Sequence, residues 1–147
     1  MEGADIEAGA QRGFGPRALL LDLEQLAGLK ILVVDDEPIV REVVADMLTS
    51  MGCTVVTAEN GHQAIEIVGR EDPAAVLLDF AMPGMNGAEV ARAVLADRPD
   101  TRIVFATGFA QSDAIDSAVG DDAIVLRKPF SPSALAESLR RALETEP

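Results

Sequence analysis

The chain contains no tryptophan, no tyrosine and only five phenylalanines among its 147 residues. Aromatic side chains are therefore too few to build most of its core. That role falls to valine, leucine, isoleucine, alanine and methionine, which dominate the 48% of residues that are hydrophobic. A chain of this length fits one domain with a core of its own.

Cysteine and long hydrophobic runs are also scarce. A single cysteine, Cys53, excludes an intramolecular disulfide and a cysteine-based metal site, and it suits a reducing cytosol. Its apolar neighbours predict a small core residue. The chain has no uninterrupted run of 18 apolar residues, and its acidic N-terminus is unlike a signal peptide. We therefore expect a cytoplasmic protein that does not bind a membrane.

Positive charge is the third scarce property. Twelve lysines and arginines stand against 25 acidic residues, which gives a formal net charge of −13. The sequence has no cluster of lysines and arginines that could contact the phosphates of a nucleic acid, so the composition argues against direct binding to nucleic acid. Basic protein patches and Mg²⁺ are the partners expected for such a chain.

From Lys30 onward, apolar runs typical of strands alternate with helical patterns. This alternation predicts an α/β fold with a parallel sheet and helices on both faces. Pro38 and Pro132 stand where a first helical turn begins, and Gly52 closes the first helix. The expected strands are at about 30–35, 54–58, 75–79, 102–106 and 123–126, and the expected helices at about 38–51, 60–71, 87–97, 111–119 and 131–145.

Two of the predicted strands end at acidic residues. Asp35 and Asp36 follow the run 30–34, and Asp79 ends the run 75–79. Because both runs are continuously apolar, they predict strands buried on both faces, and ligands bind at the carboxyl ends of such strands. Three converging carboxylates would repel one another and would suit a hard cation such as Mg²⁺. The alternative is that each aspartate only caps the following helix.

Two further strands bring a hydroxyl and an ammonium group to the same edge. Thr107 follows the fourth strand, and Lys128 follows the fifth. Alone, a threonine after a strand is usually a packing residue, and a lysine is usually solvated. Their placement at the same edge as the three aspartates favours a shared site.

Four motifs now stand in a fixed order, and together they resemble the receiver domain of two-component response regulators. The resemblance covers about residues 30–145, and it implies a flavodoxin-like (βα)5 fold with strand order 2-1-3-4-5 and a receiver domain at 30–147. The motifs are Val-Val-Asp-Asp-Glu at 33–37, Leu-Asp-Phe-Ala-Met-Pro-Gly-Met-Asn-Gly at 78–87, Ala-Thr-Gly at 106–108 and Lys-Pro-Phe at 128–130.

The resemblance implies a role for each acid. Asp79 would accept a phosphoryl group from a histidine kinase or a histidine phosphotransferase. Mg²⁺ would be bound by Asp79, by Asp36 directly, by Asp35 mainly through water, and by the backbone carbonyl of Ala81. In-line phosphoryl transfer depends mostly on positioning and on neutralising charge, which a metal ion and a lysine supply.

The resemblance also assigns the remaining site residues. Thr107 and Lys128 would each bond a phosphoryl oxygen, and the bond between Lys128 and Pro129 would be cis. Such a domain promotes its own phosphorylation and dephosphorylation and is a signalling module rather than an enzyme with a separate substrate.

One position departs from the family pattern. Most receivers carry tyrosine or phenylalanine three residues before the lysine, where this chain has Val125. The sequence Phe-Ala-Thr-Gly-Phe at 105–109 is similar to the FATGUY subgroup of single-domain regulators, which occurs in alphaproteobacterial phosphorelays, often those of stress signalling. We expect Phe109 to be the side chain that repacks when Thr107 moves.

Three functions are consistent with these residues. The first is a stand-alone phospho-acceptor that signals to an unknown downstream protein. The second is the C-terminal receiver of a hybrid histidine kinase, with residues 1–29 as a leader or linker. The third is a Mg²⁺-dependent phosphohydrolase, but this class needs an acid two residues after the nucleophile, where Ala81 stands.

Residues 1–29 differ in composition from the rest of the chain, and a short helix at about 17–27 is one prediction for them. That helix would either fray in solution or pack on the domain or on a second copy in a homodimer. His62, early in the second predicted helix, is expected to be an exposed surface residue.

Overall fold

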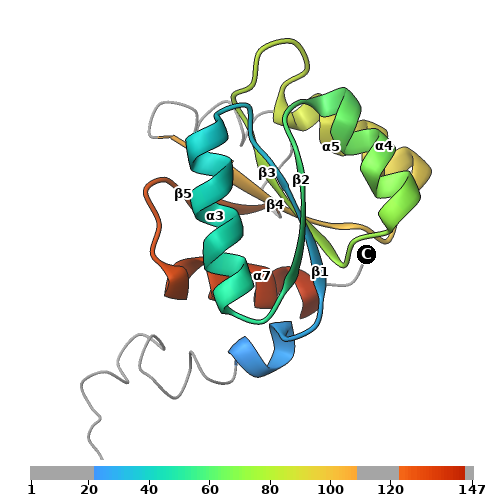
Figure 1. Cartoon of the computed structure of the whole chain (residues 1–147). Helices are drawn as coiled ribbons and strands as arrows, with labels where there is room; N and C mark the ends of the chain where they lie inside the picture. The colour runs from blue at the N-terminus through green and yellow to red at the C-terminus, as the bar shows by residue number, and fades with distance from the viewer. Residues whose placement is uncertain (1–21, 109–122, 145–147) are drawn as a thin grey trace, which may run out of the picture.

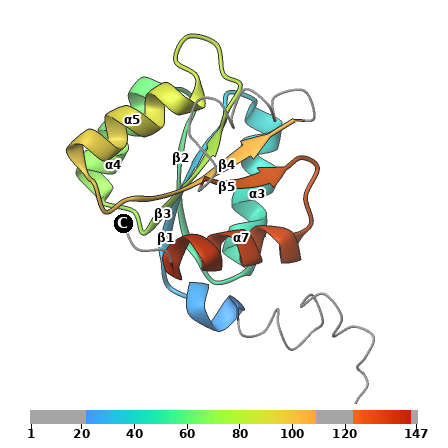
Figure 2. The same ribbon diagram turned by 180° about the vertical axis from the view of Figure 1, so that it is seen from behind.

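A five-stranded parallel sheet organises the computed structural model, which describes residues 22–108 and 123–144. The strands run in the order β2-β1-β3-β4-β5, which confirms the flavodoxin-like topology (Figures 1 and 2). The strands are β1 (Lys30–Val34), β2 (Thr54–Ala58), β3 (Ala75–Asp79), β4 (Arg102–Thr107) and β5 (Ile124–Arg127). The helices are α3 (Pro38–Ser50), α4 (Gly61–Glu71), α5 (Gly87–Asp97) and α7 (Pro132–Glu144).

Alternating side chains of the strands supply the two faces of the sheet. Ile31 and Val33 pack in the cluster that includes α3 and α7, whereas Leu32 and Val34 pack in the cluster that includes α4 and α5. All five residues of β3, in the middle of the sheet, are buried. The continuous apolar runs in the sequence thus reflect strands that are covered on both sides.

Local signals in the sequence start the helices. Pro38 and Pro132 are the first residues of α3 and α7, where the missing N–H of proline costs no helical hydrogen bond. Asn60 caps α4 by accepting from the backbone N–H of Gln63. Asn86 caps α5 in a capping box with Glu89. These helices therefore begin where short-range chemistry predicts.

The described residues before β1 belong to the core at the amino ends of the strands. Residues 22–26 are helical and lie below the sheet and beside α7 in Figure 1. Leu26 is fully buried, in one cluster with Cys53, and Asp22 pairs with Arg140 of α7 at 2.6 Å. Gly28, at φ +83°, donates its N–H to the carbonyl of Gly52 over 2.8 Å.

Some expectations concern residues outside the described ones. They are the helix at 111–119, Phe109, and residues 17–21 of the short helix. The domain boundary at residue 30 stays a prediction. Across 22–108 and 123–144, no helix combines the length and the apolar character that a membrane span requires.

Candidate functional site

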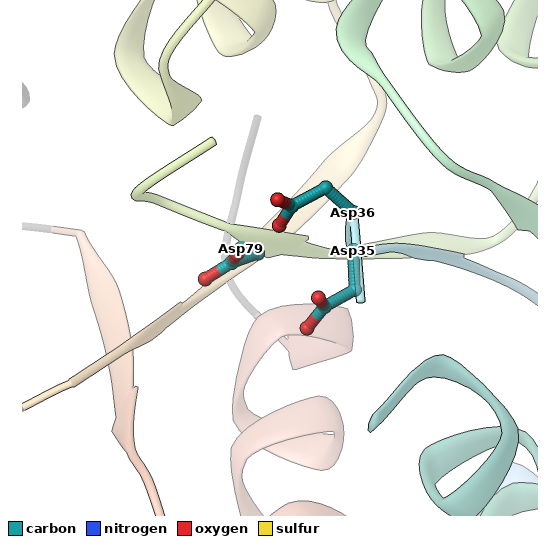
Figure 3. A group of neighbouring side chains, drawn as sticks. All are labelled: Asp35, Asp36 and Asp79. Carbon is teal, nitrogen blue, oxygen red and sulfur yellow. The ribbon is translucent and has the colours of Figure 1, made fainter. Parts of the chain in front are cut away.

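The three acids meet at the carboxyl ends of β1 and β3. These strands are adjacent and in register at Val34 and Leu78, so Asp35 and Asp79 lie at corresponding positions on one edge. One oxygen from each of Asp35, Asp36 and Asp79 lies within 4.8 Å of the others. Figure 3 shows these three side chains. Clustered carboxylate oxygens are the ligands that suit Mg²⁺, so these residues fit a divalent cation.

Burial makes this cluster costly without a cation. Asp79 is only 6% exposed. Burial raises the pKa of Asp79 above its ordinary value, the ammonium of Lys128 opposes this rise, and the charge of Asp35 adds to it. Negative charge at this edge is therefore poorly solvated and only partly neutralised.

Lys128 is the cation that the fold brings to the acids. Its Nζ lies 3.1 Å from Oδ1 of Asp79 and 3.2 Å from Oδ2 of Asp35. Burial lowers the pKa of Lys128, but the charges of Asp79 and then Asp35 outweigh that effect, and the net shift is upward. Lys128 is therefore cationic at neutral pH. The peptide bond between Lys128 and Pro129 is cis, as expected.

Thr107 lies at the same edge, one residue beyond the pairing of Asp79 with Ala106. Its side chain is completely buried, and its hydroxyl donates to the carbonyl oxygen of Gly108 over 2.9 Å. The hydroxyl is therefore engaged with its own loop rather than with the acids.

Ala81 lies in the loop after β3, and its side chain is exposed. The loop closes where Gly87 donates its N–H to the carbonyl of Phe80 over 2.8 Å. A Cβ at Gly87 would lie 2.8 Å from the Cα of Phe80, so only glycine fits there. This closure holds Ala81 close to the end of β3.

Residues 31–140 match the family model of the response regulator receiver domain. The chain belongs to the response regulator receiver family. Receiver domains are the signalling domains of two-component systems, and this family membership confirms the resemblance found in the sequence.

Several proteins are similar to this receiver. The probable transcriptional regulator ycf27 of Guillardia theta is 36% identical over 86% of this chain, which covers 49% of that protein. The chemotaxis protein CheY of Thermotoga maritima is 31% identical over 78% of this chain and 97% of its own length. The receiver domain of NtrX from Brucella abortus superposes with a TM-score of 0.73 at 30% identity, covering 79% of this chain and 99% of that structure. The chain spans about half the length of the ycf27 proteins that it matches.

Asp35 is held more firmly than the other two receiver acids. Its Oδ1 accepts from the N–H of Glu37 at 2.9 Å, while Oδ2 faces Lys128. Its own N–H donates to the carbonyl of Ala58, and its carbonyl accepts from Arg41. Asp36 is partly exposed, and its carboxylate makes no hydrogen bond to another residue in the described part of the chain. In this receiver, hydrogen bonds therefore fix the carboxylate of Asp35, whereas the carboxylate of Asp36 is available to bind a cation.

Sequence reasoning missed Arg41. Its Nη1 donates to the carbonyl oxygen of Asp35 over 2.6 Å. Nothing in the motif at 33–37 points to a residue in the following helix, because the contact depends on how α3 leaves the strand.

An apolar groove adjoins the receiver site. It has a volume of about 450 Å³ and runs between α3 and the segment that carries Lys128. Two of its residues are unusually exposed for their type, Ile39 at 76% and Val43 at 48%. The lining residues are Ile39, Val40, Val43, Val44, Met47, Lys128, Pro129 and Phe130.

Two further predictions for single residues are confirmed. Cys53 is a buried core residue, and burial raises the pKa of its thiol. His62 is exposed at the start of α4. Neither residue contributes to the receiver site.

Proposed function

We propose that this receiver accepts a phosphoryl group on Asp79 from the phosphohistidine of a histidine kinase or a histidine phosphotransferase. The observation that supports this most is the convergence of three carboxylates within 4.8 Å, with the ammonium of Lys128 at 3.1 Å from Asp79. In the transfer, an oxygen of Asp79 attacks phosphorus, the bond between phosphorus and the imidazole nitrogen breaks, and the imidazole leaves.

The proposed metal ligands are those that the receiver resemblance implies, and the contacts of the acids support them. Asp36 and Asp79 would bind Mg²⁺ directly, together with the backbone carbonyl of Ala81. Asp35 would act mainly through water, because its two oxygens already accept from Glu37 and Lys128. Bound Mg²⁺ supplies positive charge that offsets the negative phosphoryl oxygens.

Two further residues would receive the phosphoryl oxygens. Lys128 already faces Asp79 and needs only to exchange one oxygen partner for another. Thr107 must give up its bond to the carbonyl of Gly108 before its hydroxyl can donate to a phosphoryl oxygen. This exchange would report phosphorylation to the rest of the domain, and Phe109 is proposed to repack in response.

The groove beside the site supports a protein donor. Ile39 and Val43 lie one helical turn apart on α3, and Glu42 and Asp46 are exposed on the same helix. A partner helix with an apolar ridge and basic flanks would complement this surface. The same transfer chemistry serves a stand-alone regulator and the receiver of a hybrid kinase. The sequence-based expectation of no direct nucleic-acid contact stays a prediction.

Labelling with a small phosphodonor tests this function. Incubation with radiolabelled acetyl phosphate and Mg²⁺ should label the wild type, and Asp79→Asn should abolish that label. Asp97→Asn, an exposed acid at the end of α5, is the matched control and should be labelled like the wild type. Labelling of Asp79→Asn at full stoichiometry would refute the assignment.

A further inference from the structure

The contact between Arg41 and Asp35 affects the direction in which the side chain of Asp36 leaves the backbone. The carbonyl that Arg41 holds belongs to the peptide unit joining Asp35 to Asp36. Because a peptide unit is planar, fixing this carbonyl fixes the plane from which the backbone of Asp36 continues. The carboxylate of Asp36 has no hydrogen bond of its own to a described residue, so among these residues only the backbone restricts the direction in which the Asp36 side chain leaves the chain.

Two electrostatic effects act against a cation at the position of Arg41, although the acids at the same edge attract it. It is the fourth residue of α3, and its N–H donates to the carbonyl of Glu37 in the first turn. A cation near a helix N-terminus opposes the helix dipole, and a cation close to a metal site repels the metal. The contact at 2.6 Å is nevertheless short, as expected of a charge-assisted hydrogen bond.

Building on the proposed metal site, we propose that Arg41 is a positioning residue, which orients the Asp36 carboxylate for Mg²⁺ by holding the carbonyl of Asp35. Mg²⁺ requires near-ideal octahedral geometry, so a small rotation of one ligand weakens its binding. Arg41 is only partly buried, so water screens the repulsion between its charge and the metal. Orientation therefore outweighs repulsion.

The orientation of Asp36 by Arg41 and the repulsion of Mg²⁺ by its charge change the Mg²⁺ affinity in opposite directions. If orientation dominates, Arg41→Gln weakens Mg²⁺ binding by about tenfold, the scale on which partners of metal ligands act. Arg41→Lys, which keeps the charge but loses the planar fork, should fall between the wild type and Arg41→Gln. If charge dominates, Arg41→Gln binds Mg²⁺ more tightly and Arg41→Lys matches the wild type.

Calorimetric titration with MgCl₂, without any phosphodonor, measures this difference. Arg98→Gln is the matched control, because Arg98 also donates to a backbone carbonyl, that of Gly69, at 2.7 Å and belongs to no part of the site. Circular dichroism melting of each variant shows whether the fold is kept. A second readout is the Mg²⁺ concentration that half-saturates labelling by acetyl phosphate, which should rise in Arg41→Gln while Arg98→Gln stays unchanged.

Asp36→Asn in the same titration separates this inference from the proposed function. If Asp36→Asn loses Mg²⁺ binding while Arg41→Gln binds as well as the wild type or better, the role of Arg41 is overturned and the metal site stands. If the wild type does not bind Mg²⁺, or Asp36→Asn binds it unchanged, both the site and the role of Arg41 are overturned. If Arg41→Gln fails to fold, Arg41→Lys decides: affinity equal to the wild type overturns the role.

Discussion

The two ends of the sheet treat charge in opposite ways. At the amino ends of the strands, charges are paired: Lys30 lies 2.8 Å from Glu71, and Asp22 lies 2.6 Å from Arg140. At the carboxyl ends, three carboxylates lie together, and the ammonium of Lys128 pairs with only two of them, Asp35 and Asp79, among the described residues. One end of this fold is therefore arranged for stability, while the other keeps excess negative charge that can bind a cation.

The apolar contacts follow the same division. Leu26 extends the core at the amino end, where it packs with Cys53 and the end of α3. Beside the carboxyl end, Ile39 and Val43 leave apolar surface exposed. Substitutions at the amino end should therefore alter the free energy of unfolding without altering metal binding. Substitutions at the carboxyl end should alter metal binding, and some of them should stabilise the fold.

The largest effect on stability is expected from Leu26→Ala. Removing a completely buried leucine should lower the free energy of unfolding by about 2–5 kcal/mol, since a cavity remains. Urea denaturation measures the loss, and a Mg²⁺ titration of the folded variant should give the wild-type affinity. A loss below about 0.5 kcal/mol, within the range of ordinary surface changes, would mean that residues 22–29 contribute little to the core.

Adding Mg²⁺ should produce the next largest effect, this time at the carboxyl end. A free Mg²⁺ concentration ten times the dissociation constant should stabilise the fold by about 1.4 kcal/mol, because the ion binds only the folded acids. Thermal melting with and without MgCl₂ measures the gain. Asp36→Ala should remove it, and an equal rise in melting temperature in this variant would place the metal elsewhere.

Asp79→Asn should give a smaller stabilisation, seen only without Mg²⁺. Because the folded-state pKa of Asp79 is raised, its ionised form costs stability at pH values above that pKa, and the cost disappears as the pH falls below the unfolded value. The variant should therefore be more stable than the wild type at pH 7, with a gain that shrinks on acidification. Lys128 keeps Asp35 as a partner in this variant. Urea denaturation at several pH values tests the prediction, and a gain that grows at low pH would contradict it.

The smallest effect on stability is expected at the groove. Ile39→Ser should change the free energy of unfolding by less than about 0.5 kcal/mol, because the side chain is 76% exposed. Phosphotransfer from an autophosphorylated histidine kinase should nevertheless slow severalfold, while labelling by acetyl phosphate stays unchanged. Leu95→Ser, on α5 and also exposed, is the control. Equal slowing in both variants, or in neither, would count against docking at the groove.

The elements of this fold were well predicted within the described residues, because their signals are local. Pro38 and Pro132 begin helices as expected, and each predicted strand is present. Compared with the prediction, β1 ends one residue earlier, β4 ends one residue later, and β5 starts and ends one residue later. The acids also appear at the edge where the ends of the strands placed them. Arg41 and the pairing of Asp22 with Arg140 escaped prediction, because no local propensity marks either contact.

The layers of the sheet, and the edge at which the acids lie, can be read from the sequence alone. Continuous apolar runs identify strands buried on both faces, and the common direction of parallel strands brings Asp35, Asp36 and Asp79 together. The way in which each acid is held depends instead on contacts that form when the whole domain packs. The bonds from Lys128 to Asp35 and Asp79 join residues 93 and 49 positions apart, and the bond from Arg41 depends on the angle at which α3 leaves β1. Such contacts are set by packing across the whole domain, which spacing along the chain does not specify.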